Sequence, residues 1–193
     1  MLKSTILLAA AALALAASPA QAKDERAQAR FTCPDGLQVD VQIFQRPDLE
    51  SGNIYTGFDA TFSNIPASYT AGHAWHVHQT PVPAALKDGQ NDCDATGGHL
   101  DPAGVKKSGS SYKCDPKNPL STCEAGDWAG LVGNIVATSD GQLRIYYTSP
   151  DPAFLPTPYN LTQHSVVIHN ASGTRICCGN ITKLPTKCAP KPK

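Results

Sequence analysis

The chain has 193 residues, with 16 basic and 16 acidic side chains and a formal net charge of zero at pH 7. This balance argues against nucleic-acid binding and against attachment to a membrane through a basic patch. Lys3, a short apolar run and an Ala-Gln-Ala triplet give residues 1–22 the pattern of a cleavable secretory signal peptide. We therefore expect a secreted, extracellular protein whose residues 23–193 form one domain, with a core at about 30–182.

Short alternating or β-branched runs, bounded by Gly, Pro, Asn and Asp, follow the signal peptide, and convincing helical periodicity is absent. Seven or eight strands in a chain of this length indicate an all-β sandwich or flattened barrel. An Asp140-Gly141 turn is expected to join the fifth and sixth of these runs as a hairpin. The predicted strands cover 30–33, 38–44, 57–62, 74–78, 131–138, 143–148, 165–169 and 174–181.

A long segment between the predicted strands, residues 79–127, is rich in Pro, Gly, Asp, Lys and Ser. A connection of this length within a compact domain is usually functional or disordered, and the cysteines within it favour an ordered, functional loop. Seven cysteines in a secreted chain indicate a disulfide framework with one thiol left over. Cys114 and Cys123 form a reasonable local pair. Cys177 and Cys178 are neighbours on one strand, so they should face opposite sides and have different partners.

Four of the six histidines lie in three places that could meet in space. His76 and His78 flank Val77 in an alternating run, so both project from the same face of one strand. His99 follows two glycines in the long segment, and His169 ends the predicted strand 165–169. Four imidazole nitrogens that converge on one point would suit Cu(II) in a tetragonal arrangement.

Three Asn-x-Ser/Thr sequons fit passage through a glycosylating secretory pathway. Asn160, in a Pro-rich stretch, is the best acceptor of the three. Asn170 directly follows His169 and lies near the expected metal, and the third sequon begins at Asn180. The C-terminal residues 187–193 lack the hydrophobic tail of a GPI anchor, so we expect no membrane anchor.

Further motifs accompany the histidines. Cys93 stands six residues before His99 in a Gly-Gly-His-Leu-Asp-Pro sequence, residues 126–134 contain Gly-Asp and Gly-Asn, and 174–179 read Thr-Arg-Ile-Cys-Cys-Gly. Together these motifs resemble the copper/zinc superoxide dismutase family over roughly residues 30–182. The resemblance implies an eight-stranded Greek-key β-barrel with a long disulfide-tethered loop.

The resemblance also assigns roles. It implies that Cys93 pairs with Cys178, and that Arg175 lies beside the metal and attracts the superoxide anion. Cys33 is then left to pair with Cys177 or Cys188. The copper ligands implied by the resemblance are His76, His78, His99 and His169.

The chain departs from the zinc-containing members of this family. No histidine occurs between His99 and Asp127, where such members have two further zinc ligands, and the expected positions hold Lys107 and Glu124. His99 and Asp127 alone could hardly hold zinc tightly. The long electrostatic loop after the last copper histidine is also missing. Both departures resemble the secreted copper-only superoxide dismutases described mainly from fungi, so we expect copper as the cofactor and no zinc.

Without zinc, a carboxylate is needed to orient His99, which we expect to deliver a proton to the product. Glu124 is the first candidate and Asp127 the second. The leading hypothesis is therefore a copper-dependent superoxide dismutase, which we expect to be a monomer. A copper-binding or copper-delivery protein without turnover is the main alternative. An oxidative polysaccharide-cleaving copper enzyme would need an N-terminal histidine where we expect Lys23, and zinc held by unconventional ligands is a further alternative.

Overall fold

The computed structural model describes residues 25–47, 53–84, 92–106, 112–149 and 154–185. The predicted signal peptide, Lys107 and Cys188 lie outside these ranges. The described chain contains seven strands: β1 (Glu25–Thr32), β2 (Gln38–Pro47), β3 (Ile54–Ser63), β4 (Trp75–His78), β5 (Gln142–Thr148), β6 (Ser165–His169) and β7 (Arg175–Lys183). Its helices are short: α1 (Pro119–Thr122), α2 (Trp128–Val132), α3 (Pro158–Leu161), and the 3-10 turns η1 (Tyr69–Ala71) and η2 (Asp94–Thr96).

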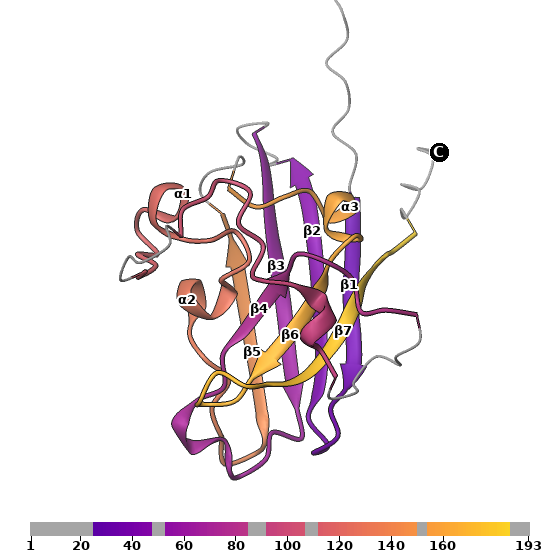
Figure 1. Ribbon diagram of the computed structural model, residues 1–193. Helices are drawn as coiled ribbons and strands as arrows, with labels where there is room; N and C mark the ends of the chain where they lie inside the picture. The colour runs from indigo at the N-terminus through magenta and orange to yellow at the C-terminus, as the bar shows by residue number, and fades with distance from the viewer. Residues whose placement is uncertain (1–24, 48–52, 85–91, 107–111, 150–153, 186–193) are drawn as a thin grey trace, which may run out of the picture.

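All seven strands belong to one antiparallel sheet in the order β4-β6-β7-β1-β2-β3-β5. β7 connects the two halves, because its first residues pair with β6 and its last residues pair with β1. The sheet curls so that β4, β6 and β7 lie across β1, β2 and β3 (Figure 1). The all-β barrel predicted from the sequence is confirmed, with seven strands in the described residues rather than eight.

One predicted strand is wrong. Residues 131–138 do not form the first strand of a hairpin. Asp127 accepts a hydrogen bond from the backbone N–H of Gly130 and so starts α2, which Gly133 ends with a φ of 99°. After this helix, Ile135 forms only an isolated bridge with His73. β5 instead pairs with β3, and α2 contacts β4.

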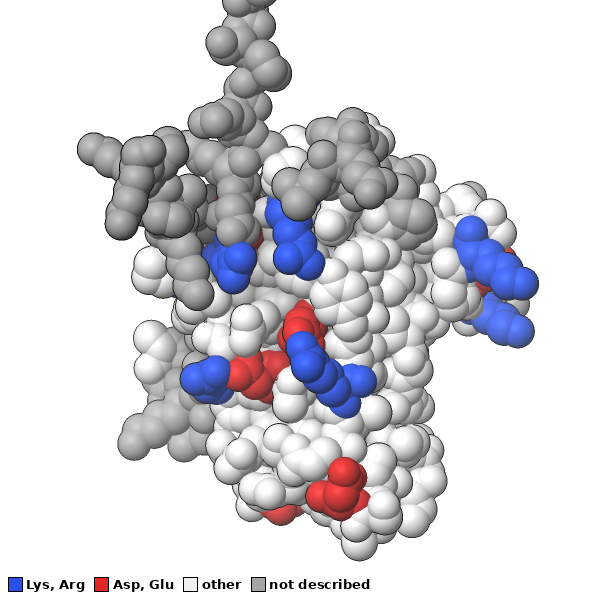
Figure 2. Space-filling view, turned by 180° about the vertical axis from the view of Figure 1, so that it is seen from behind, with Lys and Arg blue, Asp and Glu red and all other residues white. Residues whose placement is uncertain are grey.

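The interior is filled by alternate strand residues. Val39, Val41 and Ile43 of β2 are at most 1% exposed, and the residues between them are more exposed. Burying each such side chain contributes about 1.5–3 kcal/mol. The opposite face of the same strands carries paired charges, among them Arg30 with Asp40. Figure 2 shows red and blue side chains side by side at the centre of this outer face.

Two fully buried tryptophans stand directly beside candidate site residues in the chain. Trp75 precedes His76 and points into the barrel, since side chains alternate along β4. Trp128 follows Asp127 and stacks on Phe58 with ring centroids 4.4 Å apart, while Trp75 meets Phe58 edge to face at 5.4 Å. The aromatic core therefore fixes the backbone from which the site residues project.

Three disulfides hold the loops on this frame. Cys93 is bonded to Cys178 and Cys114 to Cys123, and Cys33 is bonded to Cys177. Cys177 and Cys178 serve different partners, as neighbours on one strand should. Among the described helices, none is long and apolar enough to cross a bilayer.

Candidate metal centre

The four histidines singled out in the sequence meet at one place. One nitrogen of each of the four lies within 4.8 Å of the others. The pairing of β4 with β6 brings His76 and His78 beside His169, and an isolated bridge joins His78 to His99. His99 is partly exposed, and the other three are buried.

A closed set of backbone hydrogen bonds sets the spacing of these residues. Val77 N–H donates to Gly126 C=O (2.9 Å), Gly126 N–H to Leu100 C=O (2.8 Å), and Leu100 N–H to Val77 C=O (2.8 Å). Val77 stands between the two histidines of β4, Leu100 follows His99, and Gly126 lies between Glu124 and Asp127. A Cβ at Gly126 would lie 2.3 Å from the Val77 carbonyl oxygen, so only glycine allows this approach.

In both His78 and His169, Nδ1 is hydrogen-bonded to a backbone carbonyl, and Nε2 is directed toward the Nε2 of the other histidine. Nδ1 of His78 lies 3.0 Å from Gly97 C=O, and Nδ1 of His169 lies 3.0 Å from Gly173 C=O. Carbonyl oxygens only accept hydrogen bonds, so both Nδ1 atoms carry the proton. Thr96 supports this tautomer, because its hydroxyl donates to another carbonyl and can accept from His78 Nδ1 at 3.1 Å.

The two bare Nε2 atoms of His78 and His169 face each other at 3.2 Å. Two lone pairs at this distance need a cation between or beside them. Burial and the neighbouring His99 lower the pKa of His78 to about 3, and burial lowers the pKa of His169 to about 4. A shared proton is therefore disfavoured near neutral pH, and the pair fits a metal ion.

His76 presents its other nitrogen. Its Nε2 lies 3.3 Å from Asp127 Oδ1, and its Nδ1 is buried without a hydrogen-bond partner among the described residues. Burial lowers the pKa of His76, so the imidazole is neutral, with the proton on Nε2 and a free lone pair on Nδ1. An orphaned buried acceptor of this kind is costly unless a ligand completes it.

His99 completes the donor set with Nε2, because its Nδ1 lies 2.6 Å from Glu124 Oε2. The Glu124 side chain is only 3% exposed. Of the two carboxylates predicted as candidates, Glu124 therefore contacts His99, whereas Asp127 contacts His76. Neutral nitrogen donors with their outer N–H groups held by protein acceptors are the arrangement that copper or zinc sites use.

Asp127 accepts three hydrogen bonds. Its donors are His76 Nε2, the Gly130 N–H (2.8 Å) and the hydroxyl of Tyr112 (2.8 Å). Burial alone would raise the pKa of Asp127, but these three donors outweigh it and lower that pKa. Tyr112 was not predicted as a site residue, and a lone tyrosine in a polar loop carries no sequence signal that would have found it.

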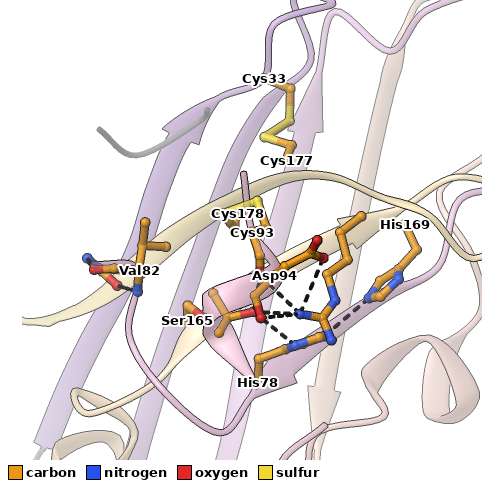
Figure 3. The surroundings of a disulfide bond; sticks show 12 residues. Cys33, His78, Val82, Cys93, Asp94, Ser165, His169, Cys177 and Cys178 are labelled. Carbon is orange, nitrogen blue, oxygen red and sulfur yellow. Dashed lines mark hydrogen bonds and ion pairs between the residues drawn. A yellow bond between two sulfur atoms is a disulfide. The ribbon is translucent and has the colours of Figure 1, made fainter. Parts of the chain in front are cut away.

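Arg175 lies at the start of β7, paired with His169 in the sheet. Its guanidinium donates to the backbone carbonyls of Cys93 (3.0 Å), Asp94 (3.0 Å) and Gly97 (2.6 Å), and its side chain is 23% exposed. Arg175 therefore fixes the loop that carries the disulfide Cys93–Cys178. Figure 3 shows this disulfide together with His78, His169 and Asp94.

The fold and the site together define a class of protein. The family model described as copper/zinc superoxide dismutase matches residues 40–181. The chain therefore belongs to the copper/zinc superoxide dismutase family.

Individual relatives come from fungi. The chain is 33% identical over 153 residues to a protein of Arthroderma benhamiae named cell surface Cu-only superoxide dismutase, covering 76% of this chain and 38% of that protein. It is 26% identical over 191 residues to a Candida albicans protein named cell surface superoxide dismutase [Cu-Zn] 4, covering 95% and 72%. The solved structure of Candida albicans superoxide dismutase 5 with Cu(II) shares the fold, with a TM-score of 0.58 at 21% identity over 89% of this chain and 99% of that one.

The chain spans well under half the length of some curated relatives, 38% and 42% for two of those named Cu-only. Those proteins carry residues beyond the shared domain. The similarity of the shared domain therefore shows the family to which the chain belongs.

Proposed function

We propose that the protein is a secreted copper-only superoxide dismutase, which converts superoxide into dioxygen and hydrogen peroxide. The observation that carries the proposal is the His99–Glu124 contact within the four-histidine cluster. His99 corresponds to the histidine that bridges copper and zinc in zinc-containing members, and here a buried carboxylate takes its Nδ1. The sequence has no histidine between His99 and Asp127 to supply the usual zinc ligands.

Copper bound by His76, His78, His99 and His169 would supply a metal that alternates between Cu(II) and Cu(I), taking an electron from one superoxide and returning it to the next. Neutral imidazoles suit both oxidation states. Burial lowers the pKa values of His76, His78 and His169 and so keeps these three imidazoles neutral, and the outer nitrogen of each contacts a protein acceptor.

His99 is the residue that would deliver a proton to the product. The His99 side chain is 22% exposed, so its ring can regain a proton from water. Glu124 holds the Nδ1–H and keeps Nε2 directed into the cluster.

Arg175 would attract the superoxide anion. Its charge is fixed by three backbone carbonyls, so it offers a preset orientation at little entropic cost. Because the long electrostatic loop of zinc-containing members is missing, this one cation would carry a larger share of the steering.

We also infer that residues 1–22 are removed on secretion, that residues 23–193 act as one domain, and that the protein works as an extracellular monomer. Relatives named cell surface superoxide dismutases support an extracellular location. Sedimentation and N-terminal sequencing of the protein from culture medium test these points.

Glu124→Gln tests the proposed role of the His99–Glu124 pair. Glutamine still accepts from His99 Nδ1 but lacks the charge, so dismutation should fall about tenfold or more and its pH profile should change. Asp59→Asn is the control, since Asp59 pairs with Arg144 on the outer face. Unchanged turnover and pH dependence in Glu124→Gln would refute the role. Full copper binding without turnover in the wild type would instead indicate a copper-binding or copper-delivery protein.

A further inference from the structure

Both acidic residues of the site contact one side chain, Asp127 through its carboxylate and Glu124 through its backbone. The hydroxyl of Tyr112 donates to Asp127 Oδ2 at 2.8 Å and accepts from the backbone N–H of Glu124 at 2.9 Å. The phenol oxygen thus uses its proton for one site residue and a lone pair for the other. Among the described residues, no other side chain contacts both Asp127 and Glu124 through a single atom.

We propose that Tyr112 is a positioning residue of the copper centre, which locks Asp127 against His76 and Glu124 against His99. The chain of contacts is continuous: Tyr112 to Asp127 to His76 Nε2, and Tyr112 to Glu124 to His99 Nδ1. The inference rests on the proposed copper site, and it adds to that site a residue, Tyr112, that the sequence analysis did not predict.

Lys106 strengthens this set of contacts from the solvent side. Its Nζ lies 3.9 Å from Glu124 Oε1, the carboxylate oxygen not used by His99, and 5.8 Å from the centre of the Tyr112 ring. Asp101 fixes this part of the loop by accepting from the backbone N–H groups of Val105 and Lys106. A positive charge therefore stands beside the buried glutamate on the side away from the histidine cluster.

The arrangement has a physical reason. A buried carboxylate that holds an imidazole must itself be held, or it rotates and loses the imidazole. Asp127 is also the N-cap of α2, where the Gly130 N–H donates to Oδ1. Without the Tyr112 hydroxyl, Asp127 Oδ2 would lose its donor and the Glu124 N–H would lose its acceptor, so the Asp127 carboxylate and the Glu124 backbone would gain freedom at once.

Tyr112→Phe tests the proposal, because it removes the hydroxyl and keeps the ring. Tyr69→Phe is the matched control: the Tyr69 hydroxyl also donates to a carboxylate, Asp35 Oδ2 at 2.6 Å, and its ring stacks on His73, which is not one of the four clustered histidines. The probe is Cu(II) titrated into the copper-free, disulfide-intact secreted protein against a competing chelator, with the Cu(II) electron paramagnetic resonance spectrum as a second readout.

Tyr112→Phe should raise the Kd for Cu(II) about tenfold and change the spectrum, and Tyr69→Phe should leave both within twofold of wild type. In an Asp127→Asn background, Tyr112→Phe should add much less than tenfold, because it acts partly through Asp127. A Tyr112→Phe protein with wild-type affinity and spectrum would overturn the proposal, as would an equal effect of Tyr69→Phe.

If Tyr112→Phe does not fold, Lys106→Gln replaces it, since this half-exposed side chain is not needed for packing. It should raise the Kd for Cu(II) about twofold to threefold, and no change would overturn the proposal. Dismutation measured on the same samples separates the two hypotheses. Wild-type protein that binds copper without turnover defeats the proposed function but leaves the positioning role open to this titration.

Discussion

Acid should destabilise the copper-free protein well before its carboxylates are protonated. Burial lowers the pKa of His78 from 6.5 to about 3 and that of His169 from 6.5 to about 4. Because these folded-state values lie below the unfolded ones, the unfolded chain binds more protons as the pH falls. Stability is therefore fully present above about pH 6.5 and is lost progressively as the pH falls toward 4.

The size of the effect follows from proton linkage. Between pH 7 and pH 5, each of the two histidines contributes a loss of about 2 kcal/mol, or about 4 kcal/mol together. For a chain of this size, the midpoint of thermal unfolding should fall by roughly 10 °C over that interval. Bound copper should offset much of the loss, since a ligand that binds only the folded state stabilises it by mass action.

Calorimetry of the copper-free protein at pH 7, 6 and 5 measures this loss. His169→Gln removes one of the two groups, so its midpoint should fall by about half as much over the same interval. His164→Gln is the control, since His164 is more exposed and bonds to backbone carbonyls of His78 and Gln79. A midpoint that stays constant or rises between pH 7 and pH 5 would refute the reasoning about buried neutral imidazoles.

Three further predictions follow from single contacts. Arg175→Ala should lower kcat/KM for superoxide, measured by pulse radiolysis, and make kcat/KM depend less on ionic strength, whereas Arg175→Lys should retain much of that dependence. If kcat/KM of the alanine variant depends on ionic strength as in wild type, the steering role is contradicted. Gly126→Ala forces a Cβ against the Val77 carbonyl, so it should lower the free energy of unfolding by about 3 kcal/mol and weaken copper binding. A thermal unfolding midpoint equal to that of wild type would argue against the closed set of backbone hydrogen bonds among Val77, Leu100 and Gly126. Asn160 is exposed on α3 and should carry a glycan, whereas the side chain of Asn180 is hydrogen-bonded to the Val82 backbone and should carry none. Glycosidase treatment followed by peptide mass analysis tests this, and a glycan on Asn180 but not on Asn160 would contradict it.

The sequence predicted the fold and the clustering of the four histidines, because both leave local signals. Alternating polar and apolar residues mark β2, β3 and β5, and the i, i+2 spacing of His76 and His78 directs both rings to one face. The Cys93–Cys178 pairing followed from family motifs, and the structure contains that disulfide. These signals come either from residues close together in the sequence or from motifs shared with the family.

What the sequence missed depends on contacts between distant segments. The run 131–138 looks like a strand, but the Asp127 cap and the packing of Trp128 on Phe58 turn its start into α2. Tyr112 and Lys106 reach the site only through the loop's path, which no periodicity encodes. Arg175 was assigned to the anion alone, and its three bonds to loop carbonyls show a second, structural role.

The most direct test of the account is the copper and zinc content of the secreted protein after loading with both metals, with superoxide dismutation assayed on the same sample. The account predicts about one copper per chain, negligible zinc and activity near the diffusional limit. Substantial zinc in the loaded protein, or one copper without dismutation, would contradict the central claim.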